Sequence, residues 1–545
     1  MSFQSLPNEI ISYIFLLGRI EKVDGSRTDV SDFHLGRVSD ESVEDFGESS
    51  DLSGGEDGEV ALNTDDDEDG QSDTGKDGEE DAQPGDEGDE KTESCLEERK
   101  QPGRGTESLP FPLVFSHVCR QWRHITLDHP SLWTSIDFFI HRSSTEYLEA
   151  YIRRSQIQPL SISMHGPISK CDEVLEPILD ESLNPSTIEQ IVSFLETVVP
   201  HAHRWRELRV FAGNARHYHP ILHRLSNCKS APLLEILQLD FERNYFGSDV
   251  LPNASPSSSS LVSPLFHSKV PKLRDLNISG VVLDWDVSVP LSTNLCRLRL
   301  AFHREEERPS LQSFAAIMAA FPQLESLDLC GSGPALDDPE EHSESGSSVS
   351  INLPSLSSLS FSVLDQSYLM SFFPLISGGI SNLTTLSLVF DSEVDDVDFS
   401  EFAQLLSSPS PVTGHSVLRG LSELRIEMPL DCTAQRLFLD QLVNLSILRI
   451  KPDDAFDEDD AMWHQLLAET LDGAGAIKYC PRLTSIYTAG FSSSDVRMVA
   501  EARLRSGSPL KLMALWSEDE LKPNDREWLE THVEELSFYE RDIDA

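Results

Sequence analysis

Two pairs of histidines are the residues in this sequence best suited to bind a metal. His201 and His203 form the first pair, and His217 and His219 form the second. Imidazole is a common ligand of zinc and other transition metals. Neither pair has a partnering acid or cysteine, however, and lone pairs of this kind are more often ordinary surface histidines. The sequence therefore predicts no bound metal and no other cofactor.

The motifs that usually mark a catalytic centre are missing from the sequence. It contains no GxSxG, no HExxH, no Walker loop and no glycine-rich dinucleotide motif. The eight cysteines are scattered and include no CxxC pair, which argues against structural zinc and a disulfide framework. We therefore predict a non-enzymatic protein without catalytic residues, in a reducing compartment such as the cytoplasm or the nucleus.

A basic segment, residues 201–229, interrupts an otherwise acidic sequence. Its cations are Arg204, Arg206, Arg209, Arg216, Arg224 and Lys229. Three interpretations of this candidate acidic-partner patch stay open. It could be a solvated face of a helix and loop, a dock for an acidic segment of the same chain, or a site for an acidic or phosphorylated substrate, because arginine clusters suit phosphate.

Acidic residues dominate the chain as a whole, which has a formal net charge of −50. Residues 21–107 hold about 31 acidic and about 8 basic side chains, together with many Gly and Ser and few apolar residues. Such a segment buries too little apolar surface to offset its chain entropy, so we predict that it is disordered. The charge argues against nucleic acid and anionic membranes as partners, because both repel an acidic surface.

Two short helices are predicted, one on either side of the acidic segment. Each has one apolar stripe, made of Leu6, Ile10, Ile14 and Leu17 in the first and of Val114, Val118, Trp122 and Ile125 in the second. Helices this short need another surface on which to bury the stripe. The pattern predicts that the second helix ends before Pro130, and that Leu132 and Trp133 anchor the next turn.

A short apolar pattern recurs from Trp133 onward at intervals averaging roughly 30 residues, which is typical of irregular leucine-rich repeats. Its copies are Trp133-Ile136-Phe138, Ile157-Leu160-Ile162, Trp205-Leu208-Val210, Leu234-Leu237-Leu239, Leu273-Leu276-Ile278, Leu295-Leu298-Leu300, Leu324-Leu327-Leu329, Leu356-Leu359-Phe361, Leu383-Leu386-Leu388, Leu421-Leu424-Ile426, Leu445-Leu448-Ile450 and Leu483-Ile486-Thr488. Helical stripes lie between some copies, at 186–198, 314–321 and 399–406. A strand followed by a helix, repeated in units too small to fold alone, predicts an α/β solenoid.

Two segments of the chain together resemble an F-box. They read Leu6-Pro7-x-Glu9-Ile10 with Ile14-Phe15, and Val118-Cys119-Arg120-x-Trp122-Arg123-x-Ile125 with a closing Pro130-x-Leu132-Trp133. Both halves in this order, followed by irregular leucine-rich repeats, resemble the large F-box family of mushroom-forming fungi. The F-box part covers less than a tenth of the chain. In that family the motif is continuous, whereas here residues 21–107 interrupt it.

The resemblance implies an adaptor of a Skp1–cullin–F-box ubiquitin ligase, which binds Skp1 through the F-box and a protein substrate through the repeats. The residues that would serve Skp1 binding and the F-box core are Leu6, Pro7, Ile10, Ile14, Phe15, Val118, Cys119, Trp122, Ile125 and Trp133. Cys119 is expected to pack as an inert thiol. Trp122 and Trp133 could contact the partner or serve only as core aromatics. The alternative function is an interaction scaffold whose interrupted F-box no longer binds Skp1.

The predicted organisation follows from these segments. Residues 1–20 and 108–136 form a split F-box-like domain around the insert at 21–107, 137–516 form the leucine-rich-repeat-like solenoid, and 517–545 form an acidic helix or tail. The predicted fold class is α/β, with a short helical module before a repeat solenoid. No apolar run reaches the roughly 18 residues that a membrane span needs, and the N-terminus lacks the layout of a signal peptide.

Overall fold

The computed structural model describes residues 111–166, 185–213, 215–241, 264–281, 283–288, 292–336, 350–390, 399–410, 413–428, 430–451, 463–471, 475–516 and 521–539. All of them belong to one compact unit of the chain. The predicted first F-box helix and the acidic segment at 21–107 lie outside the described residues.

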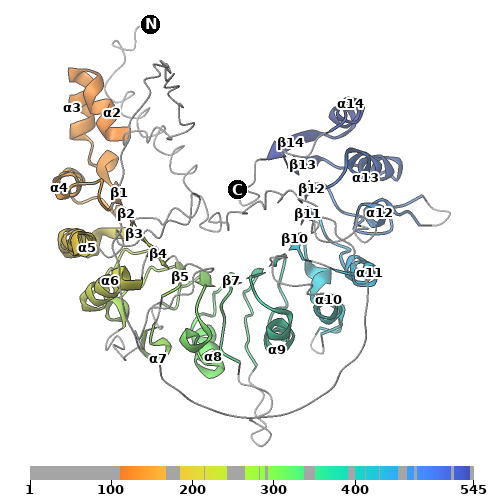
Figure 1. The fold of residues 1–545 in the computed structure, drawn as a ribbon, viewed down its shortest axis with the longest axis horizontal. Coiled ribbons are helices and arrows are strands. Elements are labelled where there is room, and N and C mark those ends of the chain that lie inside the picture. The colour runs from red at the N-terminus through yellow and green to blue at the C-terminus, as the bar shows by residue number, and fades with distance from the viewer. Residues whose placement is uncertain are drawn as a thin grey trace, which may run out of the picture. The chain divides into compact units, whose positions relative to one another are not determined.

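A parallel sheet of 14 strands, paired in chain order, runs through the described residues. The strands are β1 (Ser135–Phe139), β2 (Leu160–His165), β3 (Trp205–Ala212), β4 (Ile236–Phe241), β5 (Asp275–Ser279), β6 (Arg297–Ala301), β7 (Ser326–Cys330), β8 (Ser358–Ser362), β9 (Thr385–Val389), β10 (Glu423–Glu427), β11 (Ile447–Ile450), β12 (Ser485–Thr488), β13 (Leu512–Trp516) and β14 (Glu535–Tyr539). Helices cover one face of this sheet, on the outer side of the ribbon in Figure 1. The α/β solenoid predicted from the repeat pattern is therefore confirmed.

The helices alternate with the strands. They are α2 (Phe111–Val118), α3 (Arg120–Asp128), α4 (Thr145–Arg154), α5 (Pro185–Val198), α6 (Ala215–Asn227), α7 (Trp285–Ser288), α8 (Leu311–Ala320), α9 (Gln366–Ser377), α10 (Ser400–Ser407), α11 (Cys432–Gln441), α12 (Trp463–Ala468), α13 (Ser493–Arg505) and α14 (Pro523–His532). Short 3-10 turns are η3 (Pro130–Trp133), η4 (Val199–Arg204), η5 (Leu265–Ser268), η6 (Glu305–Glu307) and η7 (Val417–Gly420). Several helices start at a capping side chain, such as Ser144 before α4 and Asp365 before α9, which accepts a hydrogen bond from an otherwise unpaired backbone N–H. The predicted helices at 186–198, 314–321 and 399–406 correspond to α5, α8 and α10.

The strands form where the apolar pattern places two buried residues with a single residue between them. In β6, for example, Leu298 and Leu300 are buried beneath the helices, while Arg297 and Arg299 lie on the other face. Eleven of the twelve predicted copies fall on their strands in the same register. The copy predicted at β2 is shifted by two residues, because Ile162 aligns with Ile136 and Leu208, Met164 takes the third apolar position, and Ile157 is 87% exposed. The leucine spacing therefore fixes which face of each strand enters the core.

We call the side of the sheet away from the helices the strand face. Its central row, aligned strand by strand, consists of Asp137, Ser163, Arg209, Gln238, Asn277, Arg299, Asp328, Ser360, Ser387, Arg425, Arg449, Tyr487, Ala514 and Ser537. Most of these residues are polar, whereas the rows on the helix side are leucine-rich. The strand face is therefore the polar side of the sheet.

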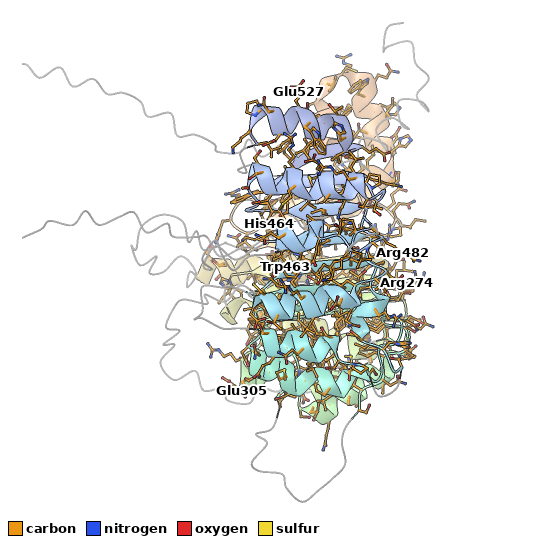
Figure 2. All side chains as sticks on the ribbon, turned by 90° about the vertical axis from the view of Figure 1, so that its right-hand side faces the viewer. Arg274, Glu305, Trp463, His464, Arg482 and Glu527 are labelled. Atoms are coloured by element: carbon orange, nitrogen blue, oxygen red, sulfur yellow. The ribbon has the colours of Figure 1, made fainter. Side chains whose placement is uncertain are left out.

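The solenoid continues past the predicted boundary at residue 516. Strand β14 pairs in parallel with β13, and Leu529 of α14 is buried, so the segment predicted as an acidic helix or tail contains a helix and also adds one more strand to the sheet. Helix α12 contacts α13, and α13 contacts α14. Figure 2 shows Glu527 of α14 at the top of this stack, above Trp463 and His464 of α12. None of the helices described in the structure has the length and apolar character needed to cross a membrane.

Candidate functional site

The helical module before the first repeat consists of α2, α3 and η3. We predicted one continuous helix with a shared apolar stripe, and this is wrong, because the chain breaks between α2 and α3 at Cys119. That residue is extended, with φ −156° and ψ 171°, and its Sγ accepts a hydrogen bond from the backbone N of Trp122 at 3.5 Å. Cys119 is also exposed, which corrects the expectation of a packed thiol. The Cys119 side chain therefore caps the N-terminus of α3 and does not pack into a core.

The break divides the predicted stripe into an exposed and a buried part. Val114 and Val118 on α2 are 42% and 55% exposed. Trp122 on α3 is half-buried and stacks on Phe115, with ring centroids 5.1 Å apart and an interplanar angle of 6°. The exposed part of the stripe therefore lies on α2, and the more buried part lies on α3.

Ile125 and Trp133 serve the core instead. Trp133 is fully buried, donates a hydrogen bond from Nε1 to the carbonyl of Thr126 at 2.8 Å, and meets the Tyr151 ring edge-on at 4.9 Å. The Arg154 guanidinium lies 4.3 Å from the centroid of the Trp133 ring. Tyr151 and Arg154 belong to α4 of the first repeat, so Trp133 joins the helical module to the solenoid.

The other predicted residues of this site, Leu6, Pro7, Ile10, Ile14 and Phe15, lie outside the described residues. The structure therefore bears on the second half of the F-box-like motif alone. Within that half, Val118 and Trp122 are accessible to a partner, whereas Ile125 and Trp133 are not.

The predicted basic patch does not form one surface. Arg204 is buried, and its guanidinium donates hydrogen bonds to the carbonyl of Gln158 at 2.8 and 2.9 Å and to Ser155 Oγ at 2.7 Å. Burial lowers the pKa of Arg204. This arginine connects the end of α4 to the start of β3, and it cannot contact an acidic partner.

The remaining cations of that segment lie on separate elements, and several form an ion pair with a nearby carboxylate. Arg209 on the strand face pairs with Glu207 at 2.9 Å, and Arg224 on α6 pairs with Glu196 on α5 at 2.6 Å. Arg206 at the start of β3 pairs with Glu235 at 3.2 Å. Lys229 is exposed after α6, and the side chain of Arg216 lies outside the described residues. Sequence proximity alone suggested a patch that the repeat geometry disperses.

The two histidine pairs do not converge on one point. His201 and His203 have ring centroids 6.4 Å apart, and burial together with Arg204 lowers the pKa of His201. His219 is exposed as predicted for a surface residue, but His217 is fully buried in α6. Among the described residues, no group of three His, Cys, Asp or Glu side chains could hold a metal ion.

An aromatic ladder crosses the first three strands on the strand face. Phe139, His165 and Phe211 are aligned by the register of β1 to β3, and the rings stack at 4.6 and 5.0 Å with interplanar angles of 13° and 10°. Burial between the two phenylalanines lowers the pKa of His165, while Asp137 acts in the opposite direction. Sequence reasoning missed this ladder, because His165 follows Met164, whereas the copy predicted at β2 ended at Ile162.

Ion pairs occupy the central row further along the strand face. Arg299 pairs with Asp328 at 3.4 Å, Arg425 with Glu427 at 2.8 Å, and Arg449 with Glu423 at 3.2 Å. Asp240 on β4 is half-buried near Arg299, and desolvation raises its pKa despite a hydrogen bond from Ser279 and the charge of Arg299. Two of these ion pairs join neighbouring strands and one lies within β10, so they are internal contacts of the strand face.

Comparison with known protein families and with curated proteins found no match for this chain.

Proposed function

We propose that this protein is a non-enzymatic adaptor that binds a Skp1-like protein through its N-terminal helical module and a protein substrate through its repeats. The observation that carries the proposal is the F-box-like sequence of the two N-terminal segments, which precede a leucine-rich-repeat-like solenoid. The exposed Val114 and Val118 beside the Phe115–Trp122 stack supply an apolar surface on the second segment.

The chemistry of such an adaptor is proximity. A substrate held on the solenoid would be brought close to ubiquitin carried by the ligase, which raises the effective concentration of the reacting groups. No residue of the chain would take part in the transfer. The six cysteines in the described residues are free thiols, which fits the reducing conditions of the cytoplasm or the nucleus.

A co-purification experiment tests the Skp1 half of the proposal. Wild type, Trp122→Ala and Val118→Lys would be expressed with Skp1 from the same source. Wild type should retain Skp1, and both variants should lose most of it, because one removes a stacked aromatic side chain and the other places a charge on an apolar contact surface.

The matched control is Leu437→Lys, which puts the same charge on an apolar side chain of α11 that is 40% exposed and remote in sequence. It should bind Skp1 like wild type. If wild type does not retain Skp1, the ligase function is excluded and the alternative of an interaction scaffold that does not use Skp1 takes its place.

A further inference from the structure

Two arginines lie side by side in the central row of the strand face. Arg425 on β10 is aligned directly with Arg449 on β11, and their side chains are 18% and 20% exposed. Neighbouring strands are about 4.8 Å apart, so the two charged groups start from adjacent backbone positions. Directly aligned like charges destabilise a sheet. The two arginines are therefore stable side by side only because neighbouring groups offset their repulsion.

Flanking carboxylates hold both guanidinium groups against the sheet. Glu427 on the same strand meets Nε of Arg425 at 2.8 Å, and Glu423 meets Nε of Arg449 at 3.2 Å across the two strands. Both ion pairs run through Nε, the inner edge of the guanidinium group. Such pairs orient the arginines and reduce the side-chain entropy that a ligand would otherwise have to remove.

The same row continues into an aromatic residue. Tyr487 on β12 is aligned with Arg449, and the Arg449 guanidinium lies 4.1 Å from the centroid of its ring. We call Arg425, Arg449 and Tyr487 the Arg–Tyr row. Arginine and tyrosine are the residue types that most often dominate binding energy at protein interfaces, because they combine large contact area with directed hydrogen bonds.

The charge around the Arg–Tyr row is reversed relative to the chain. Strands β10 and β11 with the exposed Lys451 that follows them carry three cations and two carboxylates on this side, Arg425, Arg449 and Lys451 against Glu423 and Glu427. The protein as a whole has a net charge of −50. This excess of one positive charge on two strands of a strongly acidic protein favours a negatively charged group as the ligand.

We propose that the Arg–Tyr row is the docking site for an acidic segment of a protein partner, in which Asp or Glu carboxylates bridge Arg425 and Arg449. Carboxylates match the planar guanidinium fork, and Tyr487 would pack against the backbone or an apolar side chain of the same segment. This inference deepens the proposed function, because it names the chemistry that the strand face would recognise. It rests on the proposed function only in calling the bound partner a substrate.

The test measures binding of a fluorescent Asp/Glu-rich peptide to the full chain by anisotropy, with a Ser/Asn-rich peptide of equal length as the reference probe. The double variant Arg425→Gln/Arg449→Gln should bind the acidic peptide about tenfold or more weakly than wild type, because two charge-assisted contacts are lost. Added salt should weaken binding to wild type and have less effect on the variant.

The matched control, Arg505→Gln/Arg526→Gln, removes two ion-paired arginines from α13 and α14 and should bind like wild type. Arg449→Lys keeps the charge but loses the fork and the stacking, so it should also bind more weakly. Equal binding by wild type and the Arg425/Arg449 variant would overturn the proposal.

Two further outcomes would assign the row to another occupant. Binding of a phosphoserine peptide but not of the acidic one would show a phosphate site in place of a carboxylate site. At least about tenfold tighter binding of the acidic probe after removal of residues 21–107 would identify the acidic segment of this chain as the occupant. The Arg425/Arg449 variant should still retain Skp1, and Val118→Lys should still bind the acidic peptide. Failure of this inference can therefore be told apart from failure of the proposed function.

Discussion

At the scale of single residues, the arginines of this protein divide into two groups with different surroundings. Arg204 and Arg503 are buried, and each donates hydrogen bonds to backbone carbonyls. Arg503 bonds the carbonyls of Tyr479 and Cys480 at 3.1 Å each, next to a backbone in the left-handed region with φ 46° at Cys480. Arg425 and Arg449 instead lie on the strand face beside carboxylates. Burial therefore decides which cations support the fold and which can meet a partner.

The buried thiol of Cys480 behaves as a core residue. Burial raises its pKa to about 12, so the thiol stays protonated and is a poor nucleophile near neutral pH. Cys330 on β7 is similar, because desolvation raises its pKa to about 11. Cys480 and Cys330 are therefore core residues, in contrast to the exposed Cys119.

We predict that His165 makes the stability of the folded protein depend on pH. Burial lowers its folded-state pKa below the ordinary value of 6.5, so the unfolded chain takes up the proton first as the pH falls. The free energy of unfolding should therefore decrease as the pH drops through about 6.5 toward the folded-state pKa. His165→Phe keeps a ring between Phe139 and Phe211 and removes this contribution.

Urea unfolding of both proteins at about pH 7.5 and about pH 5.5 measures the effect. The stability of wild type should fall more than that of the variant between the two conditions. An identical pH dependence in the two proteins would contradict a buried, neutral His165.

At the scale of secondary-structure elements, each repeat depends on the next one to cover its apolar surface. The final repeat shows this dependence, because Leu529 and Val533 are buried at the end of α14. Asp525 on α14 accepts hydrogen bonds from Ser493 and Arg497 of α13, both at 2.8 Å, and these bonds lower the pKa of Asp525. Strand β14 and helix α14 therefore act as the C-terminal cap of the solenoid.

Ending the chain at residue 516 should loosen the preceding repeat. The truncation removes the parallel partner of β13 and leaves the apolar side chains of α13 uncovered. Amide hydrogen exchange at β13 and α13 should become faster, while exchange at β6 stays unchanged. A chain ending at residue 539, which keeps β14, serves as the control. Unchanged protection of β13 after truncation at 516 would show that the cap is dispensable.

At the scale of the whole molecule, contacts between strands are sequential from β1 to β14. Each repeat in the described residues therefore gains most of its stability from its immediate neighbours, as in other solenoids. Phe372 on α9 is one link of this kind, because it is fully buried and its ring lies 5.9 Å from Phe314 and 6.2 Å from Phe361. Those two residues belong to α8 and β8.

Phe372→Ala should destabilise the protein locally and not uniformly. The loss of a buried aromatic side chain costs about 3–5 kcal/mol, and in a solenoid that cost falls on the adjacent repeats. Hydrogen exchange should accelerate in β7 to β9, with no change in β1 to β3. Leu437→Ala, at a partly exposed helical position, should change protection by little. A uniform increase of exchange over all strands would contradict nearest-neighbour stabilisation.

The amino-acid sequence by itself determined the repeat architecture. Two leucine-like residues with a single residue between them dictate a strand with one buried face. Eleven of the 14 strands follow from that spacing in the correct register, and β2 was located with an offset of two residues. Leu510-x-x-Met513-x-Leu515 and Val533-x-x-Leu536-x-Phe538 repeat it with less typical residues, which is why β13 and β14 were missed.

Only the tertiary structure decided which polar residues meet. The cations at 204–229 are close in sequence, yet the turn from strand to helix sends them to different sides, and Arg204 enters the core. Arg425, Arg449 and Tyr487 are far apart in sequence, yet the parallel register places them in one row. Local spacing sets the face of each strand, whereas the neighbours across strands depend on loop lengths that no short pattern encodes.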